Sequence, residues 1–151
     1  MAKNPQLGAI APDFAAEGTH GPFRLSAHRG ERVVLLFYPG DGNMICTRQF
    51  CSYRDRVDEF SNLGVRAVGI SPQDIASHDE FIARHGLTLP LLTDAGHEVS
   101  RLYDVHSKLI GTRRATFVID EHGMVRYRHD NVLSLSYDTV NDLEAALASL
   151  D

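Results

Sequence analysis

The sequence lacks three features that mark common classes of protein. It has only two cysteines in 151 residues, too few for a disulfide-rich scaffold, and this number suits a reducing compartment. No stretch approaches the roughly 18 consecutive apolar residues of a membrane-spanning helix. The formal net charge is −5, whereas nucleic-acid phosphates require a basic surface. We therefore expect a protein that binds neither membranes nor nucleic acids.

Targeting and linker signals are also missing. Residues 1–11 contain no long apolar segment, so we expect no signal peptide and a cytoplasmic location. There are no internal repeats, no low-complexity tracts and no stretch typical of an interdomain linker. The length suits one domain, and hydrophobic residues make up 43% of the chain, enough for a substantial core. We predict a single domain over residues 1–151.

Apolar runs alternate with segments of helical periodicity along most of the chain. Strands are expected at 14–15, 23–25, 33–38, 65–70, 90–93, 116–119 and 124–129. Helices are expected at roughly 43–63, 74–85, 97–103 and 139–150, and a loop at 108–113. This order predicts an α/β protein, a three-layer α/β/α sandwich with a central mixed sheet and an N-terminal hairpin, as in the thioredoxin-like fold.

Cys46 is the first candidate functional residue, because it falls just after a strand and a loop. The breakers from Pro39 to Gly42 predict the loop, and Asn43 is the expected N-cap of the helix that follows. Unpaired N–H groups and the macrodipole favour negative charge at a helix start. We therefore expect the pKa of the Cys46 thiol to be lowered and the thiolate to be a nucleophile. The 39–42 loop and Asn43 would form a pliable upstream end to this helix.

Cys51 follows Cys46 by five residues on the same predicted helix. A free cysteine is often a small core residue, but two cysteines confined to one helix start favour a redox role. The side chains that would face the core from this helix are Phe50, Tyr53, Val57 and Phe60.

A zinc site is the alternative use of these cysteines. His78 and His85 lie on one predicted helix and would complete a set of four ligands with Cys46 and Cys51. The cysteine spacing does not match the usual zinc knuckle, and a helix start is not its usual scaffold. We therefore expect no metal, and we expect the other histidines on loops and exposed faces.

The stretch around Cys46 resembles the active site of peroxiredoxins of the Q type, also called the bacterioferritin comigratory protein group. The matching residues are Phe37-Tyr38-Pro39, Cys46-Thr47, Cys51 and Arg54-Asp55. Other matches follow in order over nearly the whole chain, at 11–14, 69–71, 90–94 and 114–120. The Cys46/Cys51 spacing separates this group from other peroxiredoxins. The resemblance implies a thiol peroxidase that needs no metal or bound organic cofactor.

The resemblance also implies roles for the candidate residues. Cys46 would attack the peroxide and become a sulfenic acid, and Cys51 would convert it to an intramolecular disulfide. Thioredoxin or a similar dithiol would reduce that disulfide. Arg114 would stabilise the thiolate and the leaving oxygen, whereas Arg113 would point to the opposite face. In one regular helix the two cysteine Cα atoms lie about 8.7 Å apart. A disulfide needs about 4.4–6.8 Å, so the helix start would have to unwind.

Three more residues are expected to bind the substrate. Pro39 begins the loop, Gln49 would orient the arginine, and Tyr38 would pack beside the thiolate with its hydroxyl at the rim of the pocket. The alternatives are structural: a solvated position for Gln49 and for the arginines, and a half-buried ring for Tyr38. Asn43 departs from the family pattern, which has Thr or Ser there. An amide also donates and accepts, but with a different reach.

Two other functions stay open on the same fold. A thiol–disulfide oxidoreductase is disfavoured, because such enzymes use Cys-x-x-Cys, whereas four residues separate Cys46 from Cys51. A weakly active redox sensor is the other alternative, if Asn43 marks the loss of peroxidase function. We expect a monomer or a weak homodimer.

Overall fold

A mixed sheet forms the centre of the computed structural model, which describes residues 4–131 and 136–150. Its strand order is β5-β4-β3-β8-β9. The strands are β3 (Val33–Phe37), β4 (Arg66–Ser71), β5 (Leu91–Thr93), β8 (Arg114–Ile119) and β9 (Val125–Asn131). β3, β4 and β5 are parallel, β8 runs antiparallel to β3, and β9 antiparallel to β8. Every residue of the central strand β3 is buried, as its continuous apolar run predicts.

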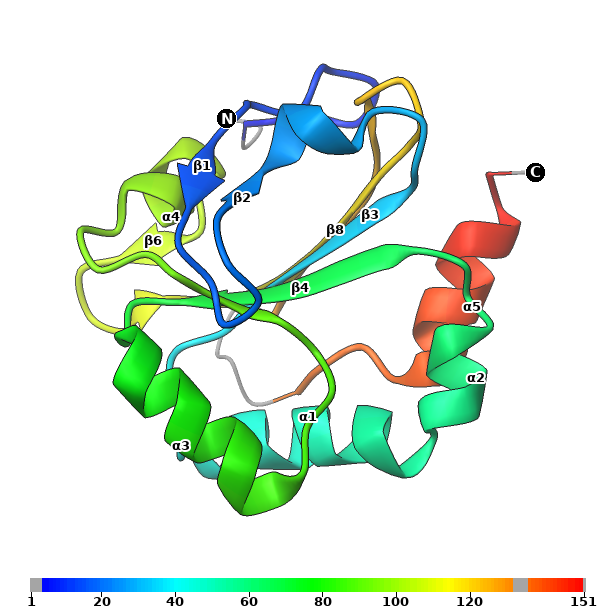
Figure 1. Cartoon of the computed structure of the whole chain (residues 1–151). Helices are drawn as coiled ribbons and strands as arrows, with labels where there is room; N and C mark the ends of the chain where they lie inside the picture. The colour runs from blue at the N-terminus through cyan, green and yellow to red at the C-terminus, as the bar shows by residue number, and fades with distance from the viewer. Residues whose placement is uncertain (1–3, 132–135, 151) are drawn as a thin grey trace.

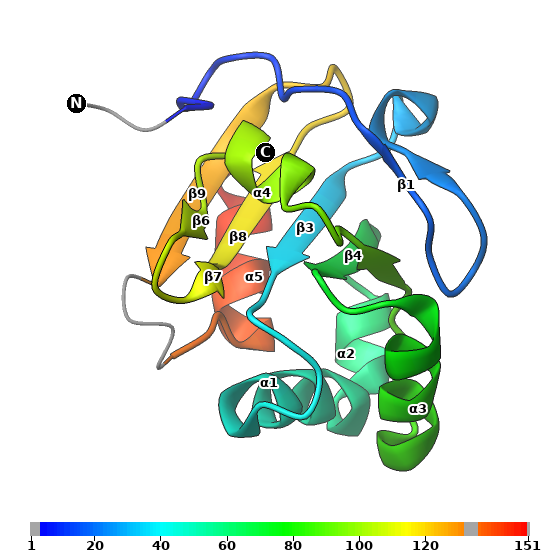
Figure 2. The same ribbon diagram turned by 90° about the vertical axis from the view of Figure 1, so that its left-hand side faces the viewer.

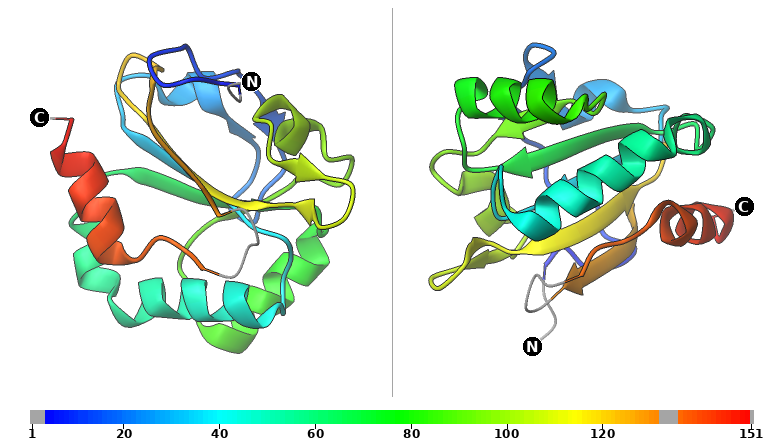
Figure 3. Two further views of the ribbon diagram at one scale, coloured as in Figure 1. Left: turned by 180° about the vertical axis from the view of Figure 1, so that it is seen from behind. Right: turned by 90° about the horizontal axis from the view of Figure 1, so that it is seen from below.

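Helices and short elements cover both faces of the sheet (Figures 1 and 3). One face carries α1 (Met44–Asp55), α2 (Val57–Ser61), α3 (Ile75–His85) and α5 (Val140–Ala148). The other carries the hairpin of β1 (Ala15–Ala16) and β2 (Phe23–Arg24), the 3-10 helix η1 (Leu25–His28) and α4 (Glu98–Leu102), as Figure 2 also shows. The predicted three-layer sandwich with an N-terminal hairpin is therefore confirmed.

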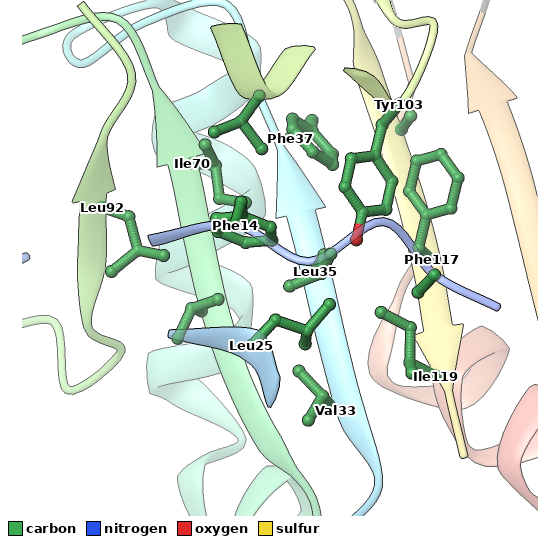
Figure 4. Packing of buried hydrophobic residues seen from close by; sticks show 14 of the residues in the cluster. Phe14, Leu25, Val33, Leu35, Phe37, Ile70, Leu92, Tyr103, Phe117 and Ile119 are labelled. Carbon is green, nitrogen blue, oxygen red and sulfur yellow. The ribbon is translucent and has the colours of Figure 1, made fainter. Parts of the chain in front are cut away.

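The alternation of β3 side chains divides the core into two clusters. Leu35 and Phe37 face the N-terminal layer, whereas Leu36 faces the layer of α1 and α5. Figure 4 shows the first cluster, where Phe14 and Tyr103 lie over the sheet with their rings edge to face. The Tyr103 hydroxyl donates to the Pro12 carbonyl over 2.6 Å, which ties the N-terminal segment to this layer.

The single helix predicted at 43–63 is wrong, because the chain leaves helical geometry at Arg56 (φ −116°, ψ 42°). No glycine or proline marks this break. The Arg56 guanidinium instead bonds Glu59 and Asn141, which lies on α5. Val57, the next residue, is 39% exposed, so its predicted place in the core is also wrong.

The loop predicted at 108–113 contains part of a small antiparallel ribbon, formed by β6 (His106–Ser107) and β7 (Gly111–Thr112). Its turn uses the Ser107 hydroxyl, which accepts the N–H groups of Leu109 and Ile110, and a positive φ of 87° at Gly111. Strands of two residues carry no hydrophobic period, so the pattern could not reveal them. Within the described parts of the chain, no helix is long and apolar enough to cross a membrane.

Candidate active site

Cys46 lies in the first turn of α1, immediately after the loop that leaves β3. The Asn43 side chain accepts the N–H groups of Ile45 and Cys46 over 2.9 and 3.2 Å, so the predicted N-cap is confirmed. Cys51 belongs to the same unbroken helix, and both cysteines are free thiols. Cys46 is fully buried and Cys51 partly buried.

Arg114 brings a positive charge to Cys46 from the first residue of β8. Its Nη2 donates to the Cys46 Sγ over 3.0 Å, and its Nη1 donates to Gln49 Oε1. Arg114 and Gln49 are each 1% exposed, so the solvated alternatives do not hold for either residue. Arg113 instead bonds the Asp104 carbonyl over 3.0 Å, outside this cluster.

The contacts behind Gln49 fix the direction of its amide. The Gln49 Nε2 donates to the Tyr53 hydroxyl over 3.0 Å, and that hydroxyl donates to the Asp138 carbonyl over 2.6 Å. A carbonyl only accepts and a guanidinium only donates, so each end of this series of hydrogen bonds has one possible role. Gln49 must therefore present its oxygen to Arg114, and the guanidinium plane is held against the sulfur.

The electrostatics of Cys46 are set by burial and by this cation. Burial raises the pKa of the Cys46 thiol, while the Arg114 charge and a hydrogen bond from the Gly40 N–H lower it in part. The predicted lowering of the pKa is thus wrong for this closed site, because the helix start alone does not outweigh the loss of water. Because Cys46 is fully buried, a peroxide can reach its Sγ only after neighbouring residues move.

Tyr38 does not place its hydroxyl at the rim of a pocket, as the sequence interpretation expected. The side chain is fully buried, and its hydroxyl donates to Asp41 Oδ1 over 2.7 Å. Asp41 Oδ2 also accepts from Ser77 Oγ and contacts His78 Nδ1, each at 2.7 Å. The loop after β3 is therefore anchored to α3 at Asp41. The pliable end expected at 39–43 stays a prediction.

A family model described as AhpC/TSA family matches residues 7–128. The chain belongs to the AhpC/TSA family. It is 39% identical over 127 residues to the chloroplastic peroxiredoxin Q of Oryza sativa subsp. japonica. The matched region covers 82% of this chain and 58% of that protein. It is 37% identical over 127 residues to the chloroplastic peroxiredoxin Q of Sedum lineare, with 82% and 68% covered. The chain thus spans little more than half the length of the rice relative.

Solved structures agree with this assignment. Peroxidoxin BcpB from Mycobacterium tuberculosis has a TM-score of 0.85 and 30% identity over 97% of this chain and 98% of its own. AhpC from the same organism has a TM-score of 0.84 at 20% identity over 96% and 92%, which shows the shared fold. The resemblance to Q-type peroxiredoxins and the thioredoxin-like fold are confirmed for this AhpC/TSA member.

The structure does not unite the residues of the zinc alternative. The two ring nitrogens of His78 contact Asp41 Oδ2 and the Leu92 carbonyl, so no nitrogen is left for a metal. Among the described residues, no group of three or more His, Cys, Asp or Glu side chains could hold a metal ion. Pro39 is half-buried beside the buried Gly40, and its contact with a substrate stays a prediction.

Sequence reasoning missed three residues that hold the site residues in place through hydrogen bonds, namely Tyr53, Asp41 and Asp138. Tyr53 was expected only as a core residue, and its polar end had no visible partner. His78 did carry a signal, because it lies three residues from Ile75 and from Phe81 on the inner face of α3. A histidine on an apolar helix face needs buried hydrogen-bond partners. Asp41 is the acidic residue of the loop before Cys46.

Proposed function

We propose that this protein is a thiol peroxidase that reduces hydrogen peroxide and organic hydroperoxides. The observation that carries the proposal is the 3.0 Å contact of the Arg114 guanidinium with Cys46 Sγ in a site closed to water. A fixed cation there stabilises the thiolate and the negative charge that develops on the departing oxygen. Membership of the AhpC/TSA family and relatives named peroxiredoxin Q support it.

The first step consumes one peroxide molecule. The Cys46 thiolate attacks one peroxide oxygen, the S–O bond forms and the O–O bond breaks, and Cys46 becomes a sulfenic acid. The other oxygen leaves with the bonding electron pair and takes a proton, which yields water or an alcohol. Arg114 donates to the sulfur and would also donate to the leaving oxygen, while its bond to Gln49 would hold the guanidinium in place.

The second step uses Cys51. Its thiolate attacks the Cys46 sulfur, the S–S bond forms and the S–O bond breaks, and the leaving hydroxide takes a proton to become water. A dithiol of the thioredoxin type then reduces the disulfide by exchange. The sequence predictions of a cytoplasmic location, a single domain and a monomer or weak homodimer stay predictions.

The two alternative functions differ from this one in measurable ways. A thiol–disulfide oxidoreductase uses Cys-x-x-Cys to reduce protein disulfides, whereas four residues separate Cys46 from Cys51. A redox sensor would oxidise without sustained turnover. An insulin-reduction assay identifies the first, and repeated peroxide consumption with a thioredoxin system excludes the second.

The test of the proposal uses two cysteine variants with hydrogen peroxide and an organic hydroperoxide. Cys46→Ser should abolish peroxide reduction. Cys51→Ser should complete one turnover to a sulfenic acid, seen by mass spectrometry, and lose recycling by thioredoxin. Loss of the first turnover in both variants alike would contradict these roles, and a parent protein that consumes no peroxide would refute the proposal.

A further inference from the structure

His78 is a fully buried titratable group that the proposed reaction does not use. It lies on α3, next to α1 on the same face of the sheet (Figures 1 and 2). Its Nδ1 is 2.7 Å from Asp41 Oδ2, and its Nε2 is 3.0 Å from the Leu92 carbonyl on β5. The Tyr38 hydroxyl is 3.4 Å from Nδ1 but donates to Asp41 at 2.7 Å. Both ring nitrogens therefore face acceptors.

This arrangement assigns the charge of the pair. A backbone carbonyl never donates, so Nε2 carries a proton. Burial would raise the pKa of Asp41, but hydrogen bonds from His78, Tyr38 and Ser77 together lower it. An ionised Asp41 cannot donate to Nδ1, so Nδ1 carries a proton as well. The hydrogen-bond pattern thus describes an imidazolium paired with a carboxylate, with side-chain exposures of 0% and 6%.

The pair lies close enough to Cys46 to affect it in two ways. Asp41 belongs to the loop whose Gly40 N–H donates to the Cys46 sulfur, and its own N–H donates to Gln73 Oε1 over 2.9 Å. The Gln73 amide lies so near Gly40 that a Cβ there would meet it at 2.9 Å. The Asp41 charge raises the pKa of Cys46. A buried cation on Asp41 must weaken that effect.

We infer that His78 is a positioning residue for Cys46: its imidazolium holds Asp41 and the Gly40 N–H in place, and it balances the Asp41 charge beside the sulfur. The inference rests on the proposed peroxidase function. Without His78, Asp41 is a buried carboxylate that has lost the cation in contact with it. Either the loop moves toward water or the negative charge acts on Cys46 in full, and both outcomes disfavour the thiolate.

The experiment measures the thiolate absorbance of Cys46 against pH, together with alkylation of Cys46 by iodoacetamide, in a Cys51→Ser background. Neither measurement uses peroxide, so this inference can fail while the peroxidase proposal stands, and the reverse. His78→Gln should raise the pKa of Cys46 by about one unit, and it should slow alkylation of Cys46 by iodoacetamide about tenfold at neutral pH. Asp79→Asn changes one charge on the exposed neighbour of His78 and should leave the pKa of Cys46 unchanged.

A double variant separates charge balance from structural damage. His78→Gln with Asp41→Asn removes both charges and should return the pKa of Cys46 toward that of the parent. A folded His78→Gln protein whose Cys46 has the parental pKa and the parental alkylation rate would overturn the inference. So would a double variant that shows no recovery, because the effect would then be structural.

Nitrogen-15 NMR of the unmodified protein serves if His78→Gln fails to fold. The His78 ring should show two N–H groups at neutral pH. A neutral ring there would overturn the assigned charge and with it the inference.

Discussion

Arg114 and Cys46 are 68 residues apart in the chain, yet the guanidinium Nη2 lies 3.0 Å from the thiol sulfur. The contact exists because β8 pairs with β3: Arg114 is the first residue of β8, and Cys46 lies in the first turn of α1, the helix that follows β3. Both side chains are buried, so water screens the interaction little.

Replacing Arg114 should therefore slow the first step strongly. Arg114→Met should reduce the rate of Cys46 oxidation by about 10²–10³-fold, the effect of removing a donor from a developing oxyanion. Arg114→Lys keeps the charge, but its ammonium lacks the planar fork that bonds the sulfur and Gln49 together, so it should also be slow. Arg113→Met, the adjacent cation outside the site, is the control. Quenched-flow mass spectrometry measures the sulfenic acid, and equal rates for the parent and Arg114→Met would contradict the assignment.

Gln49 should matter through Arg114 rather than by touching the peroxide. Gln49→Leu removes a hydrogen bond to a buried cation and another to Tyr53, and hydrogen bonds to charged groups are worth about 1.5–3 kcal/mol. The first step should slow by about tenfold or more, with a lower melting temperature. Arg48→Gln, an exposed neighbour on α1, is the matched control. A Gln49→Leu protein with parental rate and stability would show that the amide does not hold the arginine.

Much of this site could be predicted from sequence because its chemistry is local. Cys46, Cys51 and Asn43 lie within one stretch, and the N-cap follows from residue type and spacing. Arg114 came from the family pattern. The hydrogen bonds that hold these site residues in place could not be predicted. The contacts Gln49–Tyr53–Asp138 and Asp41–His78 depend on the packing of α5 and α3. The break at Arg56 could not be predicted either, because no glycine or proline marks it and the Arg56 guanidinium bonds Asn141, a residue of α5 that is distant in sequence.

The rate of the first step should increase with pH through the neutral range. Burial raises the pKa of Cys46 more than Arg114 and the Gly40 N–H lower it, so the thiol form dominates at neutral pH. The thiolate fraction, and with it the rate, should still be increasing near the ordinary thiol pKa of about 8.5. The measurement is the oxidation rate of Cys51→Ser protein against pH. A plateau below about pH 7 would show that the cation outweighs burial.

Asn43 tests the departure from the family pattern. Asn43→Thr keeps an oxygen that can cap α1 and adds a hydroxyl that can donate to the peroxide while it accepts. The first step should become faster with little change in stability, whereas Asn43→Ala should lose about 1 kcal/mol of helix capping. A slower Asn43→Thr enzyme would mean that the amide itself takes part in the site.

Disulfide formation requires α1 to unwind at its start. Both cysteines lie in one unbroken helix, where five residues place their Cα atoms about 8.7 Å apart. A disulfide needs about 4.4–6.8 Å, so the turns that contain them must open before Cys51 can attack. Asp41 is anchored to α3, and Tyr53 is anchored in the core and to the Asp138 carbonyl, so the opening falls between these two residues.

Gln49 lies inside the segment that opens, so oxidation should also separate Gln49 from Arg114 and dismantle the peroxide site. Hydrogen exchange at residues 45–52 should become faster on oxidation, while the α3 amides at 79–85 keep their protection and serve as the internal control. Arg114 should react with an arginine-modifying reagent in the oxidised protein only. If the disulfide is confirmed by mass spectrometry and both regions keep the same protection in the two redox states, the helix does not unwind and the second step needs another geometry.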